Sequence, residues 1–265
     1  MEKRPITRRG ALAGGAGMLA VLAGCLDSLT GGPSVDGVPI DADGGDGLAL
    51  SPDESVDLSH IDPSEFETTE QDGVEVPLAP IEITHDWYRA GEARFVDARG
   101  GGQYESVRIE GAVLSPAPDG GDPDPISDWD TDELIVTYCD CPHHLAAARA
   151  AALIDDGYEN VYVIDEGFVP WRENGYAVAG ENVDEVESLW TVNGVTDTSL
   201  AGNLVWGMHE ETDQQEAVPI ADDGTFEMTI RFTGVTDETP LTLETSTTRV
   251  ERPLGELSRE TVQLY

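Results

Sequence analysis

The sequence predicts an α/β fold with a parallel sheet flanked by helices, followed by a small all-β, sandwich-like domain. Between Val76 and Gly180, short apolar runs alternate with helix-forming segments, a pattern typical of a parallel sheet. After Gly180 the pattern changes to short β-prone runs separated by turn residues. In addition, an apolar run ends at Cys139, and an Ala-rich run over residues 146–153 follows, which places a cysteine between a strand and a helix.

The strands and helices of the first region are predicted from its apolar runs and from the residues that typically begin or end a helix. Strands are expected over residues 78–83, 94–99, 111–114, 134–138 and 161–164, with a Gly-rich turn at 100–102. Helices are expected over residues 85–90, with Thr84 as the cap, and over residues 143–156, ended by Gly157. The carboxyl ends of parallel strands carry the ligand sites of such sheets, and Cys139 falls there.

The second region reads as antiparallel strands. They are expected over residues 189–192, 204–208, 226–232 and 241–243, with turns at Asn193-Gly194, residues 222–224 and Thr239-Pro240. About 85 residues are enough for one hydrophobic core.

The charge balance is strongly acidic. The chain has 14 Lys and Arg against 53 Asp and Glu, a formal net charge of -39. In dilute salt such a chain repels itself, whereas in molar salt the Debye length falls to roughly 3 Å. We therefore predict a protein adapted to very high salt. Nucleic acid is not an expected partner, because phosphate binding requires basic patches.

The N-terminus has the pattern of an export signal. Thr7-Arg8-Arg9-Gly10 resembles a twin-arginine motif, and an apolar run over residues 11–23, too short to span a bilayer, follows it. Leu22-Ala23-Gly24-Cys25 resembles a lipoprotein box, so Cys25 would become the lipidated first residue of the mature chain. An uncleaved signal anchor is the alternative. Either way, we expect the protein to be held on the outer face of the cell membrane.

Four segments follow from these patterns. We expect a twin-arginine lipoprotein signal over residues 1–25 and a flexible acidic tether, rich in Gly, Asp, Ser and Pro, over residues 26–75. The α/β domain would take residues 76–180 and the C-terminal β-domain residues 181–265.

The position of Cys139 favours a thiolate. A loop leads from the strand into the helix, and the loop amides and the helix dipole would stabilise negative charge there. With Cys25 lipidated, only Cys139 and Cys141 remain. A disulfide between cysteines this close in the sequence would not stabilise the fold.

The α/β region resembles a rhodanese-like domain. The resemblance is carried, in order, by Phe95-Val96-Asp97-Ala98-Arg99, Tyr104, Arg108-Ile109-Glu110-Gly111-Ala112-Val113, Tyr138-Cys139, Gly157-Tyr158, Val161-Tyr162-Val163, Glu166-Gly167, Trp171 and Gly175-Tyr176-Ala177-Val178. It covers about 100 residues, and the shared order and spacing of the pieces make it specific.

The resemblance implies a sulfurtransferase without a cofactor. A small donor such as thiosulfate would transfer its outer sulfur to Cys139, and a thiol or another thiophilic acceptor would remove it. By position, Cys139 is the nucleophile. The loop that would hold the persulfide consists of Asp140, Cys141, Pro142, His143, His144 and Leu145. Asp97 and Arg99 would either help to order this loop or form a structural ion pair.

The loop departs from the family pattern. Pro142 and His144 stand where the family commonly has glycine and arginine. Pro142 has no N–H to donate, His144 is only partly charged near neutral pH, and Asp140 beside the thiol disfavours the thiolate. A dianionic donor therefore meets a less positive site than is usual.

Two alternatives remain open at the level of sequence. The altered loop and the appended β-domain also suit a non-catalytic binding protein built on the same fold. Cys139, Cys141, His143 and His144 form a soft ligand set, which suits a redox or metal module, with Cys141 as a resolving thiol in the redox case. Against a metal site, the four donors lie within six residues, whereas structural zinc sites draw ligands from separated segments.

Overall fold

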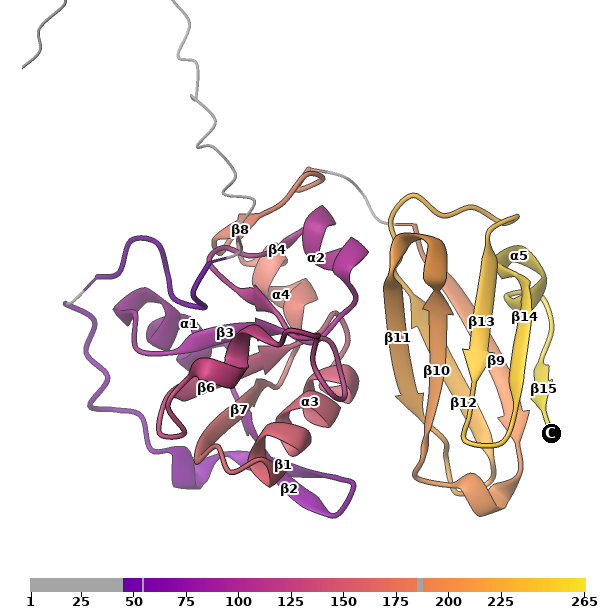
Figure 1. Cartoon of the computed structure of the whole chain (residues 1–265), viewed down its shortest axis with the longest axis horizontal. Coiled ribbons are helices and arrows are strands. Elements are labelled where there is room, and N and C mark those ends of the chain that lie inside the picture. The colour runs from indigo at the N-terminus through magenta and orange to yellow at the C-terminus, as the bar shows by residue number, and fades with distance from the viewer. Residues whose placement is uncertain (1–44, 54, 185–187) are drawn as a thin grey trace, which may run out of the picture. The chain divides into compact units, whose positions relative to one another are not determined.

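The computed structural model describes residues 45–53, 55–184 and 188–265 (Figure 1). The expected signal, with Cys25, and the first part of the expected tether lie outside the described residues. Within the described part of the chain, no helix is both long enough and apolar enough to cross a membrane.

The first region contains a mixed six-stranded sheet in the order β1-β2-β7-β6-β3-β5. β1 pairs antiparallel with β2, and the other neighbours are parallel. The strands are β1 (Glu67–Gln71), β2 (Val74–Ala79), β3 (Arg94–Asp97), β5 (Val113–Leu114), β6 (Leu134–Tyr138) and β7 (Asn160–Ile164). β6 lies between β3 and β7, so its near-continuous apolar run is what a strand buried on both faces requires.

Helices cover both faces of this sheet (Figure 1). They are α1 (Ile81–Ala90), α2 (Gly101–Ser106), α3 (His144–Asp155) and α4 (Phe168–Glu173). Successive strand side chains alternate between the faces. Ile135 belongs to the core that includes α3, whereas Val136 belongs to the core that includes residues of α1 and α4. A short pair, β4 (Arg108–Ile109) and β8 (Val178–Ala179), lies outside the main sheet.

Two local predictions in this region are wrong. The first helix begins at Ile81, not at His85, and Thr84 is a buried residue inside it whose hydroxyl donates to the Ile81 carbonyl. The expected Gly-rich turn opens α2, because Gly100 is its N-cap and Gln103 closes the cap with a side-chain bond to the Gly100 N–H.

Residues 45–53 and 55–75, expected in the flexible tether, are bound to the α/β region. The Gly47 N–H donates to the Gly111 carbonyl at 3.0 Å, and the Gly47 carbonyl accepts from the Phe95 N–H at 2.7 Å. Asp53 donates through its N–H to the Arg89 carbonyl. β1 and the start of β2 also fall within this segment, so it extends the main sheet.

The C-terminal region contains two sheets around a shared core. One has the order β11-β10-β13-β14 and the other β12-β9-β15. Their strands are β9 (Trp190–Thr196), β10 (Leu204–His209), β11 (Gln214–Pro219), β12 (Thr225–Ile230), β13 (Pro240–Glu244), β14 (Arg249–Pro253) and β15 (Val262–Leu264), with the short helix α5 (Leu254–Leu257) before the last. All pairs are antiparallel except β15 with β9.

The strand predictions here are correct for β9, β10, β12 and β13, and three strands were missed. The expected turn at Asn193-Gly194 is wrong, because both residues pair within β9. Phe226 lies across from Gly194, and its ring occupies the space that a side chain at residue 194 would need. The glycine therefore serves packing inside a strand.

Candidate functional site

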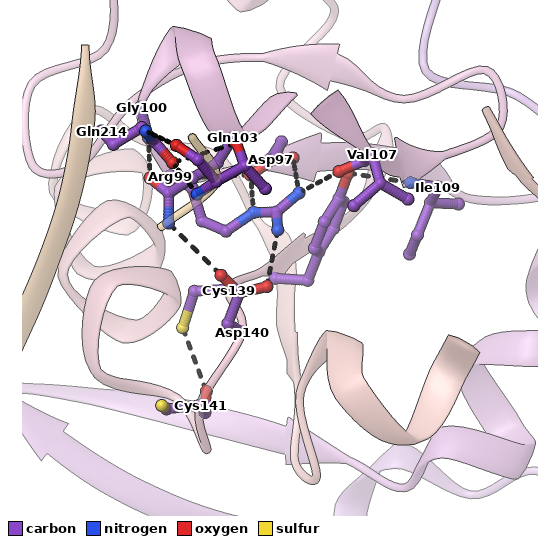
Figure 2. Close-up of polar contacts among 12 residues, drawn as sticks. Asp97, Arg99, Gly100, Gln103, Val107, Ile109, Cys139, Asp140, Cys141 and Gln214 are labelled. Atoms are coloured by element: carbon purple, nitrogen blue, oxygen red, sulfur yellow. Dashed lines mark hydrogen bonds and ion pairs between the residues drawn. The ribbon is translucent and has the colours of Figure 1, made fainter. Parts of the chain in front are cut away.

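Cys139 follows the last residue of β6, at the carboxyl end of the parallel strands. Its side chain has no exposed surface and belongs to the core beneath α3. The Sγ donates to the Cys141 carbonyl at 3.1 Å and accepts from the Ala146 N–H at 3.4 Å (Figure 2). The thiol is thus held between a loop carbonyl and the first turn of α3.

The expected cradle of loop amides is not formed. Among the described residues, the Ala146 N–H is the backbone donor that contacts Sγ, and the loop contributes a carbonyl acceptor instead. The carbonyls of Cys139, Asp140 and Cys141 all approach Gly167, within 3.0–3.1 Å of where its Cβ would lie. The Cys139 carbonyl also accepts from the Phe168 N–H at 2.8 Å. This arrangement suits a protonated thiol.

Gly167 has φ of 80°, a conformation that side chains rarely adopt. We expect Gly167→Ala to destabilise the fold by about 1–3 kcal/mol from the backbone alone, and by more because its Cβ meets three carbonyls. Denaturant unfolding in molar salt measures this loss. Gly157→Ala, at φ of 98° with open space around it, is the matched control. Equal losses of unfolding free energy in the two variants would show that the contacts with the three carbonyls do not destabilise Gly167→Ala.

The expectation of a stabilised thiolate is wrong for this state. Burial raises the pKa of Cys139 well above its ordinary value, and the carboxylates of Glu216 and Asp140 raise it further. The hydrogen bond from the Ala146 N–H acts in the opposite direction but is outweighed. Cys139 is therefore a thiol near neutral pH in the described conformation.

Asp97 and Arg99 do reach the cysteine loop, through Asp140. Arg99 donates to Asp97 from Nε at 2.9 Å and from Nη2 at 2.7 Å, and to Asp140 from Nη1 at 2.5 Å (Figure 2). Nη2 also donates to the Val107 carbonyl at 2.7 Å. Gln103 donates to the second oxygen of Asp140 at 3.3 Å. Asp140 is thus anchored in a buried network, which fixes the residue next to Cys139.

The other loop residues take separate roles. Pro142 is exposed, and Leu145 is fully buried in the core. His143 has φ of 50°, and its Nε2 lies 3.4 Å from an oxygen of Asp165. His144 begins α3, and its Nδ1 is buried without a hydrogen-bond partner.

His144 does not serve as a strong anion ligand here. Burial, followed by the neighbouring His143, lowers the pKa of His144, so it is neutral at neutral pH. His144 therefore does not replace the family's arginine. Within the described ranges, no three His, Cys, Asp or Glu side chains are arranged to hold a metal ion.

Sequence reasoning missed a contribution from the C-terminal β-region. Both regions belong to one compact unit, and β11 contacts α2 and α3. The Gln215 N–H donates to the Gln103 side chain at 2.9 Å, and the Gly102 N–H donates to the Asp213 carbonyl at 2.9 Å. Ala217 joins the core beneath α3. β11 is therefore one wall of the cysteine site.

Glu216 of β11 is the residue that reaches the thiols. It is 1% exposed, and its Oε1 accepts from the Ala217 N–H at 2.9 Å. Burial and then the charge of Asp140 raise its pKa to about 8, while hydrogen bonds from the Ala217 N–H and the Cys141 thiol lower it. A glutamate in a polar run gives no sequence signal that it will be buried.

Cys141 shares this environment. Burial, Glu216 and Asp140 together raise its pKa to about 12, and Arg231 opposes them through its charge and a hydrogen bond. Both cysteines are free, and both are protonated at neutral pH.

Comparison with known proteins gives a consistent identification of the α/β region. The family model described as the rhodanese-like domain matches residues 82–174. No curated protein matches the chain.

Solved structures with low identity also match. A rhodanese-like domain from Anabaena sp. is 18% identical and aligns over 42% of this chain and 85% of its own, with a TM-score of 0.38. A Rhodopseudomonas palustris protein of unknown function, described as a possible tyrosine phosphatase, is 22% identical. It aligns over 39% of this chain and 85% of its own, with a TM-score of 0.34. A thiosulfate sulfurtransferase from Pseudomonas aeruginosa is 20% identical. It aligns over 39% of this chain and 20% of its own, with a TM-score of 0.32.

The family model spans residues from α1 to α4 and includes β3, β5, β6 and β7 of the sheet, Cys139 with its loop, and the buried network. The chain therefore contains a rhodanese-like domain, to which a further β-rich region is joined.

Proposed function

We propose that the protein is a sulfurtransferase in which Cys139 carries sulfane sulfur. The observation that supports this most directly is the place of Cys139 in a rhodanese-like domain, at the end of β6 with its Sγ against the first turn of α3. Both the strand end and the helix start are suited to hold a reactive sulfur.

The reaction exchanges one S–S bond for another. The Cys139 sulfur attacks the outer sulfur of the donor, the donor's S–S bond breaks, and the electron pair leaves with the remainder of the donor. The enzyme then holds Cys139–S–SH. A thiolate acceptor attacks the outer sulfur, and Cys139 is released. No oxidant or reductant is needed, because sulfane sulfur is passed on without a net redox change.

The described conformation is the closed one. Cys139 is wholly buried and protonated, so the proposed cycle requires the loop or β11 to move before a donor arrives. Opening would hydrate the thiol and remove the burial that raises its pKa.

We expect Cys139→Ser to abolish sulfur uptake. The measurement is intact-mass spectrometry of the full chain in molar salt, before and after a persulfide donor and, separately, thiosulfate. Wild type should gain one sulfur atom that cyanide removes, and the serine variant should gain none. Cys141→Ser is the control and should keep the gain. Uptake that survives Cys139→Ser would refute Cys139 as the carrier.

A second candidate is a non-catalytic binding protein. The complete burial of Cys139 and its raised pKa favour this candidate, because a resting nucleophile is usually more accessible. The same experiment separates the two functions. Absence of uptake from either donor, with both thiols shown to be free after unfolding, would favour the binding protein.

We also propose that the protein is exported and anchored through a lipid on Cys25, which rests on the N-terminal sequence. The test is cell fractionation of Cys25→Ser, which should move the protein from the membrane to the soluble fraction. Retention of the variant in the membrane fraction would support an uncleaved anchor instead.

A further inference from the structure

The charges around the two cysteines come from both regions of the chain. Asp140 lies next to Cys139, and its charge is shared with Asp97 across one guanidinium, that of Arg99. Glu216 approaches from β11 and acts on both thiols. Arg231 supplies the opposing charge beside Cys141. At pH values above about 8, where Glu216 is ionised, three carboxylates face two guanidinium groups.

The remaining polar groups do not compensate for this excess. His144 is neutral, Pro142 has no N–H, and the Cys139 sulfur donates to the carbonyl oxygen of Cys141. The site is also dry, since Cys139 and Glu216 are buried almost completely. In such surroundings an added negative charge is costly, and salt screens buried charges much less than exposed ones.

Sulfur donors differ in how much charge they bring to this site. Thiosulfate enters with two negative charges, and sulfite leaves with two. An alkyl persulfide with no other ionised group enters with one negative charge, as R–S–S⁻. Its outer sulfur bonds to Cys139, its S–S bond breaks, and the leaving R–S group takes the proton released by the Cys139 thiol. The products are Cys139–S–S⁻ and R–SH, so atoms, electrons, protons and the single charge balance.

We propose that Glu216, supplied by the appended β-region, makes the Cys139 site selective for singly charged alkyl persulfides over doubly charged thiosulfate. This inference rests on the proposed sulfurtransferase function. It assigns the β-region a role in the chemistry: β11 closes the site and also determines which donors it accepts.

The test compares two donors on the full chain in molar potassium chloride at about pH 9, where Glu216 is ionised. They are thiosulfate and the persulfide of N-acetylcysteine methyl ester, which has no ionised carboxyl or amine. Single-turnover persulfide formation is followed by rapid quench and intact mass, and the rate ratio between the donors is the readout. We expect Glu216→Gln to raise the thiosulfate rate relative to the persulfide rate at least about tenfold, the effect of removing one nearby charge.

Two further variants make the outcome specific. Glu216→Asp keeps the charge and should keep the wild-type ratio. Glu227→Gln removes an exposed carboxylate of β12 and should also leave the ratio unchanged. If Glu216→Gln leaves the ratio unchanged while Cys139-dependent uptake persists, the selectivity is refuted and the sulfurtransferase stands. If neither donor loads Cys139 in wild type or in Glu216→Gln, both proposals fall.

Discussion

Replacing Arg99 with methionine should lower the unfolding free energy by about 3–5 kcal/mol, which is the usual cost of removing one partner from a buried ion pair. Arg99 is 1% exposed and is held by both Asp97 and Asp140. Without it, two carboxylates would remain in the interior with no cation between them. Its guanidinium also lies 4.6 Å from the ring centroid of Phe168, so the substitution removes a cation–π contact as well.

Denaturant unfolding in molar salt checks this result, because high salt screens exposed charge pairs but leaves the buried pair largely intact. Arg99→Lys keeps the charge but loses the bidentate contact with Asp97. Its unfolding free energy should lie between those of wild type and Arg99→Met. Adding Asp140→Asn to Arg99→Met should recover part of the loss. A loss below about 1 kcal/mol in Arg99→Met, the range of exposed ion pairs, would contradict a buried network.

The second large effect concerns Glu216 and pH. Burial and Asp140 raise the pKa of this carboxyl from its ordinary value of 4.5 to about 8. Between these pH values the folded protein holds a proton that the unfolded chain has lost. The unfolding free energy should therefore decrease as pH rises from 4.5 to 8, by up to about 1.4 kcal/mol per pH unit. Below pH 4.5 and above pH 8, Glu216 does not make the unfolding free energy depend on pH.

Glu216→Gln should lack this slope, because the amide does not titrate and still offers an oxygen to the Ala217 N–H. The measurement is the difference in unfolding free energy between wild type and variant from pH 4.5 to 8.5, which cancels most contributions from other groups. The variant should gain stability over wild type as pH rises. A constant difference would mean that Glu216 titrates normally and is hydrated in the folded protein.

The arrangement of the first region was predictable because its strands are buried on both faces. Such strands carry continuous apolar runs, and β6 and β7 were placed within one residue. Errors arose where local signals compete. Thr84 has the chemistry of a cap, but the helix begins earlier, at Ile81, because Pro80 supplies an extended residue before it. Gly100 was read as part of a turn, although Gln103 makes it a helix start.

The candidate site was only half predictable. Strand, cysteine and helix follow one another in the chain, so the position of Cys139 follows from local pattern. Glu216 is different, because its burial depends on how β11 packs against α2 and α3. Gln214, Gln215 and Glu216 read as a polar segment, and the run lacks the apolar alternation that marks a strand. The predicted thiolate failed first because burial raises the pKa of Cys139, and then because the carboxylate of Glu216, which raises it further, comes from a distant part of the chain.

The order of these parts along the chain has a consequence for biosynthesis. The ribosome releases Cys139 and Cys141 well before β11, and the last residues of the chain supply β15, which completes the sheet around β9. Domains generally fold as units, N-terminal first, during synthesis. The thiols of each new molecule are therefore open to oxidants and alkylating agents before their cover has been made. A sulfur that is modified in this interval is enclosed when β11 docks, and reagents reach it again only when the site opens.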